Sequence, residues 1–249
     1  MTLMFLGPLL AWSLAGCGAS VVEPSAAQPP DEGGGPAAPG SSGFATDAPS
    51  GPVAPGDVRA LPPPDRRGGM PLVEALDRRR SVRTFAATAL DDRELGQLLW
   101  AAQGATGDGR RTAPSAGATY PLEVLVATAR GLFRYLPGEH ALRLVDLSDL
   151  RPALADAAGQ QEFVATAPAV MIITAVTERT AARYGAERAR RYVVLEAGHA
   201  AQSVLLAATA LGLGSVPVGA FDDRQLARLL GLAAGEEPLY MLPVGHPGD

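Results

Sequence analysis

The 249-residue chain contains no lysine, so all 21 of its basic residues are arginine. A lysine Schiff base and a lysine general base are therefore excluded. Cys17 is the single cysteine, which excludes a disulfide within the chain and leaves no cysteine nucleophile in the part expected to fold. Because only three histidines accompany it, a zinc site of the Cys/His type is disfavoured.

The chain also has no excess of positive charge. Its formal net charge of −5 argues against a general nucleic-acid binder, which would carry a basic face or stripe. A hydrophobic content of 47%, together with 29 glycines and 22 prolines, is typical of a folded protein with a disordered portion. The length allows one or two domains.

The N-terminal residues have the pattern of a targeting signal. Residues 3–14 form an apolar run that is too short to span a bilayer but suits the core of a signal peptide. The box LAGC at residues 14–17 resembles the cleavage site of bacterial lipoproteins. The resemblance implies a signal peptide over residues 1–17 and a diacylated Cys17 that anchors the protein to a membrane on the exported side of a bacterial envelope. The alternative is a fortuitous apolar start in a cytoplasmic protein.

Residues 18–69 are rich in proline, glycine, alanine and serine and have almost no large apolar side chains. Such a composition cannot bury enough surface to offset the entropy of ordering, which predicts a disordered linker. Only its last portion, residues 58–64, is a candidate to lie against the domain.

Residues 70–249 are expected to form one domain. Helical spacing of apolar residues, with capping-box spacing at Asp91 and Glu94, predicts helices; the expected helices are 72–79, 91–104, a short one ending near 159, 186–211 and 222–230. The expected strands are 122–128, a hairpin of 132–136 and 141–145, 169–176, 215–221 (strand or loop) and 239–244. Because strands and helices do not alternate regularly, we expect an α+β three-layer sandwich with a central mixed or antiparallel sheet flanked by helices.

Residues 78–85, RRRSVRTF, concentrate four guanidinium groups and two hydroxyls. Arginine forks match phosphate oxygens in a bidentate manner, so the segment could hold an anion. A solvated, charged helix end is the alternative, because arginine also complements the helix dipole there.

Four segments in order carry a resemblance to a known family: RRSVRTF at 79–85, PSAGATYP at 114–121, EAGHAAQS at 196–203 and GLGSVPVGAF at 212–221. They resemble the nitroreductase family of flavoproteins, and most of all its SagB-type branch of azoline-oxidising dehydrogenases. The resemblance implies a homodimer with one flavin mononucleotide (FMN) in each subunit interface.

The resemblance also implies roles for single residues. Arg79, Ser81 and Arg83 match positions that hold the FMN phosphate and ribityl chain, and Arg80 matches a variable position near the ribityl chain or flavin edge. The positions implied along the flavin ring are Pro114, Ser115, Ala116 and Gly117 on one side, Pro217, Val218, Gly219 and Ala220 on the other, and Gln202 facing the partner's site. The amides of Gly219 and Ala220 would stabilise negative charge on the reduced flavin.

The implied reaction is a hydride transfer through flavin N5 with ping-pong kinetics, using NAD(P)H or another small organic electron donor or acceptor. No Rossmann fingerprint is present, so a nicotinamide would bind in the open flavin pocket. Tyr120 is a candidate base if the substrate is an azoline. The alternative function is a flavin-free, membrane-tethered lipoprotein that uses the fold as a binding or scaffold module; a serine hydrolase is disfavoured because Gly-x-Ser-x-Gly is missing.

Three further polar residues have ordinary structural interpretations. We expect Glu196 to pair with Arg190 or Arg191 and His199 to be a packed or interface residue. His140, in a turn, is expected to be solvated.

Overall fold

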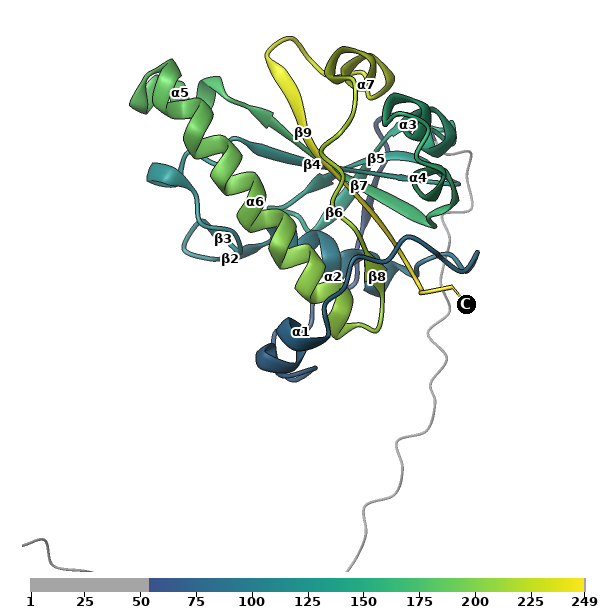
Figure 1. The fold of residues 1–249 in the computed structure, drawn as a ribbon. Helices are drawn as coiled ribbons and strands as arrows, with labels where there is room; N and C mark the ends of the chain where they lie inside the picture. The colour runs from purple at the N-terminus through teal and green to yellow at the C-terminus, as the bar shows by residue number, and fades with distance from the viewer. Residues whose placement is uncertain (1–53, 249) are drawn as a thin grey trace, which may run out of the picture. The chain divides into compact units, whose positions relative to one another are not determined.

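The computed structural model describes residues 54–248 and shows a seven-stranded sheet covered by helices on both faces (Figure 1). Cys17, the signal peptide and most of the linker lie outside the described residues. The strands are β1 Val58–Ala60, β2 Ala105–Gly107, β3 Arg110–Arg111, β4 Leu122–Thr128, β5 Gly131–Leu136, β6 Ala141–Asp146, β7 Ala169–Val176, β8 Gly214–Ser215 and β9 Glu236–Gly245. The helices are α1 Leu72–Arg78, α2 Asp92–Gln103, α3 Arg151–Ala157, α4 Glu162–Thr166, α5 Glu178–Tyr184, α6 Ala186–Ala210 and α7 Asp223–Leu229, with a 3₁₀ turn η1 at Ala116–Ala118.

The large sheet has the strand order β1-β6-β5-β4-β7-β9-β8, and its neighbouring strands pair antiparallel throughout. The expected mixed or antiparallel sheet is therefore antiparallel. β4 and β7 occupy its centre and are buried along nearly their whole length, since helices cover both of their faces.

Alternation along β7 separates the two hydrophobic layers, because successive side chains of a strand point to opposite faces. Met171 and Ile173 pack with α2 and α6 in one cluster. Val170 and Ile172 pack with α3, α4 and α7 in the other. The result is helix, sheet and helix in three layers, as expected for an α+β sandwich.

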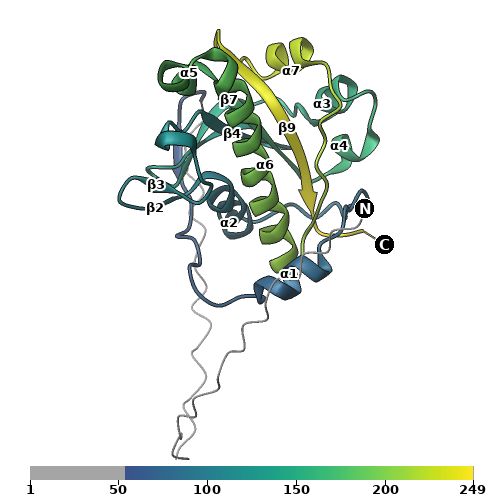
Figure 2. The same ribbon diagram turned by 60° about the vertical axis from the view of Figure 1, so that its left-hand side comes forward.

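α6 is the long helix of the first layer and runs from α5 at one end to α1 and β8 at the other (Figures 1 and 2). Its length and hydropathy would allow it to cross a membrane, but its buried stripe packs on α2 and the sheet as a core helix does. The helix ends before Gly212, whose φ of 74° is the left-handed conformation common after a helix C-terminus.

The folded domain begins before residue 70, the boundary expected from composition. β1 pairs antiparallel with β6, and Leu61, directly after β1, is 7% exposed and belongs to the core. His140 anchors the same segment: its Nε2 lies 2.9 Å from the carbonyl of Pro62, and its Nδ1 lies 2.9 Å from the hydroxyl of Tyr135. The expectation of a solvated His140 was wrong. Its contact with Pro62 joins residues that are far apart in sequence, so the residues around the turn do not predict it.

Candidate functional site

The arginine-rich segment after α1 docks on β8. Ser81 forms a parallel bridge with Ser215, and the amide of Val82 donates to the Ser215 carbonyl at 3.1 Å. Gly214 permits this approach, because a Cβ there would lie 2.6 Å from the Cβ of Val82. The segment is thus held by backbone pairing, which leaves its polar side chains available.

Three arginines of this segment lack a carboxylate partner in the described chain, and the side chains of two of them, Arg79 and Arg83, also donate no hydrogen bond there. Arg78 pairs with Glu74 at 2.6 Å, one helical turn away, and Arg80 donates to backbone carbonyls beside it. Within residues 54–248, neither Arg79 nor Arg83 forms an ion pair with a carboxylate. Two guanidinium groups and the exposed Ser81 hydroxyl can therefore receive an anion.

A second set of donors follows β8. Val218 exchanges two backbone hydrogen bonds with Met241, at 2.8 and 3.0 Å, which fixes the direction of residues 217–220. Gly219 and Ala220 come next and are exposed, and in the described part of the chain no group accepts a hydrogen bond from either amide. Two adjacent N–H groups are thus left without an acceptor in the described chain, directly after a backbone position that Val218 fixes.

The loop at residues 114–120 has an unusual backbone. Gly117, Ala118 and Tyr120 have φ values of 59°, 54° and 45°. Non-glycine residues rarely adopt this region, and persist there only when their surroundings hold them. The Tyr120 amide donates to Ser115 Oγ at 2.9 Å, which closes the loop on itself.

Helix α5 holds this loop at three points. Arg179 donates to the Tyr120 carbonyl at 3.0 Å, and the Thr180 hydroxyl lies 2.8 Å from that of Thr119. Arg183 donates to the Gly117 carbonyl at 3.2 Å. The sequence did not reveal this helix or its contacts, because a seven-residue helix with few apolar residues has no clear periodicity.

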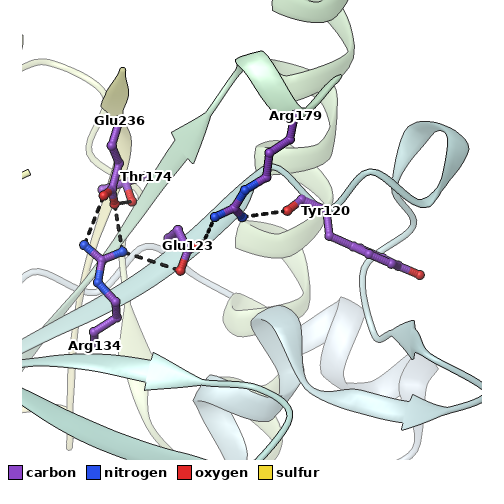
Figure 3. A network of polar contacts seen from close by, with 6 residues as sticks. All are labelled: Tyr120, Glu123, Arg134, Thr174, Arg179 and Glu236. Atoms are coloured by element: carbon purple, nitrogen blue, oxygen red, sulfur yellow. Dashed lines mark hydrogen bonds and ion pairs between the residues drawn. The ribbon is translucent and has the colours of Figure 1, made fainter. Parts of the chain in front are cut away.

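A polar network ties α5 to the sheet (Figure 3). Arg179 bonds Glu123 at 2.6 Å, and Glu123 lies 3.4 Å from Arg134. Arg134 in turn bonds both carboxylate oxygens of Glu236, whose side chain is 5% exposed, at 2.9 and 3.1 Å. The ring of Tyr120 points away from this network and lies under the Arg111 guanidinium, whose carbon is 5.5 Å from the ring centroid.

A pocket of about 290 Å³ opens between the loop and α6. Its lining comprises Pro114, Ser115, Ala116, Tyr192, Leu195, Glu196 and His199. Glu196 is 3% exposed, and burial raises its pKa to about 7, although a hydrogen bond with Ser115 acts in the opposite direction. Among the described residues, Oε1 of Glu196 has no hydrogen-bond partner, so the expected pairing with Arg190 or Arg191 does not form.

The residues expected around a flavin therefore do not all meet within one chain. The 114–117 loop lies beside Glu196, in the first half of α6, whereas residues 79–83 adjoin β8, which follows the last residue of α6. Residues 217–220 leave β8 along β9, where Val218 pairs with Met241. At about 1.5 Å per residue, the helix from Glu196 to Ala210 is roughly 20 Å long. Gln202 is exposed between them, on the face of α6 that also carries Leu195 and His199.

The C-terminal histidine contacts α2 through its side chain and the end of the arginine segment through its backbone. His246 Nε2 is 3.5 Å from Glu94, the capping-box residue of α2, and its carbonyl accepts from the amide of Ala86.

This α+β sandwich carries an arginine–serine segment at one edge of its sheet. Comparisons with known proteins identify the class of protein to which it belongs. The Nitroreductase family model matches residues 76–246. A protein of Methanocaldococcus jannaschii whose name contains "nitroreductase" is 44% identical over 199 residues, covering 77% of this chain and 98% of that protein. The chain therefore belongs to the nitroreductase family and is an oxidoreductase by family.

Similar solved structures support the same assignment of the fold. A nitroreductase-type structure from Ralstonia eutropha JMP134 is similar with a TM-score of 0.71 and 34% identity, covering 80% of this chain and 97% of that one. The NADPH:FMN oxidoreductase of Vibrio harveyi, solved with NAD+, has a TM-score of 0.55 and 23% identity over 72% of this chain and 69% of that one. The second likeness concerns the fold alone.

Proposed function

We propose that this protein is an FMN-dependent oxidoreductase that works as a homodimer, with each flavin held between two subunits. The observation that carries the proposal is a set of hydrogen-bond donors that have no acceptor in the described chain, on the segments that pair with β8 and follow it. Arg79 and Arg83 lack carboxylate partners in the described chain, Ser81 is exposed, and the Gly219 and Ala220 amides are unbonded there.

These donors are of the chemical types that bind FMN. The phosphate is a dianion that guanidinium forks and a hydroxyl bind well, and exposed amides suit the carbonyl and ring-nitrogen edge of a flavin. Arg79, Ser81 and Arg83 would hold the phosphate and ribityl chain, with Arg80 beside them. Pro217–Ala220 would follow one side of the ring.

The separation along α6 supports the two-subunit arrangement. The loop Pro114–Gly117 and the arginines of its own chain lie at different levels of that helix, and the loop of a second subunit would complete the site. Exposed apolar residues on α1 and α6 supply a surface for such a contact: Leu72, Val73, Leu76, Val194, Leu195 and Leu211. Gln202 would then face the partner's site.

Bound FMN would supply hydride transfer at N5, and the protein would supply binding, orientation and charge stabilisation. The donors at Gly219 and Ala220 would stabilise negative charge that develops on the ring. NAD(P)H or another small organic molecule would enter the same open pocket as the second substrate, which gives ping-pong kinetics. Of the family's branches, the segments PSAGATYP and EAGHAAQS favour the SagB type, in which Tyr120 would be available as a base.

Flavin uptake by the purified full-length chain tests this function. We expect a yellow protein whose visible spectrum returns when FMN is added after its removal, with one FMN per chain. Arg83→Ala should weaken binding at least tenfold, whereas Arg78→Ala, which removes an arginine already paired with Glu74, should change it little. A colourless protein that takes up no FMN would support the flavin-free binding or scaffold module instead.

We also propose that Cys17 is lipidated and tethers the domain to a membrane on the exported side. Metabolic labelling with a fatty acid should mark the full-length chain and not Cys17→Ala. Equal labelling of both, or of neither, would reject the anchor and favour a cytoplasmic protein.

A further inference from the structure

Glu196 occupies a position where a carboxyl group is costly. It lies in the buried stripe of α6, between Val193 and Ala200, where the other inward side chains are apolar. Moving an ionised carboxylate out of water carries a large penalty unless a partner compensates it. No arginine does so within residues 54–248, so the group is maintained there at a cost to stability.

Ser115 lies beside the carboxyl group of Glu196 in the pocket lining, and its side chain acts to lower the pKa of Glu196 against the larger effect of burial. The Ser115 oxygen also accepts from the Tyr120 amide. Oε1 of Glu196 has no partner in the described chain. Protonation removes the cost of burying a charge beside this oxygen, and the raised pKa of about 7 keeps a proton on the carboxyl group near neutral pH.

The pocket brings this carboxyl group beside the expected flavin loop. Pro114, Ser115 and Ala116 form one wall, and small side chains there allow a planar molecule to approach. The other titratable groups nearby are Tyr192 and His199, which line the pocket from α6, and Arg183 and Tyr184 on α5, which touch the loop near Gly117. Burial, rather than one of these charges, is the main cause of the raised Glu196 pKa.

We propose that Glu196 is the proton-transfer residue of this pocket, donating from its carboxyl group to an oxygen or nitrogen of an acceptor bound against Pro114–Ala116. The proposal rests on the proposed function, and the acceptor is a planar molecule that takes up one hydride and one proton, for which a quinone serves as the probe. A quinone would gain one hydride from reduced flavin and one proton from Glu196, giving the hydroquinone. The carboxylate left behind would regain a proton from solvent through the pocket mouth.

Infrared spectroscopy of the full-length protein, with and without FMN, follows the proton directly. We expect a protonated-carboxyl band that disappears as the pH rises through about 7. The band should be missing in Glu196→Gln and unchanged in Glu187→Gln, which alters an exposed carboxylate on the same helix. In Ser115→Ala the band should persist to higher pH, because the hydrogen bond that favours the anion is lost. Identical spectra for wild type and Glu196→Gln would overturn the proposal.

Kinetics with a quinone supply the second readout. Glu196→Gln should lower kcat/KM about 100-fold, the usual lower range for loss of a proton-transfer group, with FMN affinity retained. Glu196→Asp should recover part of the loss. An unchanged kcat/KM in a Glu196→Gln protein that still binds FMN would reject the role of Glu196 alone. Failure of the wild type to bind FMN would instead reject the proposed function.

Discussion

Arg179 donates a hydrogen bond of 3.0 Å to the carbonyl of Tyr120, a residue whose φ is 45°. The same guanidinium group bonds Glu123 on β4 at 2.6 Å (Figure 3). One side chain on α5 therefore connects a strained loop residue to the centre of the sheet. Strained backbone of this kind costs of order 1–3 kcal/mol and requires such support.

Arg179→Ala should weaken FMN binding about fivefold, because the loss of one net hydrogen bond of about 1 kcal/mol lets the 114–120 loop relax. Fluorescence titration of FMN measures the change. Arg190→Ala, which alters an exposed arginine on α6, is the matched control and should bind as wild type does. Equal affinity in the two variants would show that α5 does not support the site.

Gly117→Ala should reshape the same loop. Its φ of 59° disfavours a side chain, and the new Cβ would lie 2.6 Å from the Tyr184 hydroxyl and 2.8 Å from Arg183 Nε. We expect a loss of about 1–2 kcal/mol in the free energy of unfolding, with weaker FMN binding. Gly138→Ala, where no atom lies within 4 Å of the added Cβ, should cost little by the same denaturation measurement. A Gly117→Ala protein as stable as wild type would contradict the close contact between this loop and α5.

The buried Glu196 predicts a specific pH dependence of stability. Its pKa is about 7 in the folded protein against an ordinary value of 4.5, so the folded state binds this proton more tightly than the unfolded state. The stabilisation that this proton gives the folded state is complete below about pH 4.5 and is lost as the pH rises through 7. Relative to Glu196→Gln, the free energy of unfolding of the wild type should therefore fall by about 3 kcal/mol between these limits.

Urea denaturation of both proteins at several pH values measures this difference. Glu187→Gln, on the exposed side of α6, should follow the wild type throughout. A constant difference between wild type and Glu196→Gln across this range would mean that Glu196 ionises at an ordinary pKa.

The elements with strong local patterns were predictable. β4 and β7 have the expected bounds, and α2 begins with the expected capping box between Asp91 and Glu94. α4 and α5 were missed because five and seven residues give too little periodicity, and β1 because its partner, β6, is distant in sequence. Local patterns record propensity, whereas these elements depend on tertiary contacts.

The candidate site was likewise predictable only in part. The motifs located the arginine segment and the loop, but no short-range pattern reveals that α5 supports the loop or that the two groups lie at different levels of α6. Glu196 did carry a signal: it falls in register with Val193 and Ala200 on the apolar stripe of α6, which places it inward.

The central claim, that each flavin lies between an arginine segment and the loop of a second subunit, is tested most directly by mixed dimers. One subunit would carry Arg83→Ala together with Arg79→Ala, and the other Gly117→Val. Neither variant alone should retain FMN, whereas the mixed dimer keeps one intact site and should bind one FMN per two chains. Mixed dimers that bind no FMN would contradict the claim, since both groups would then have to come from the same subunit.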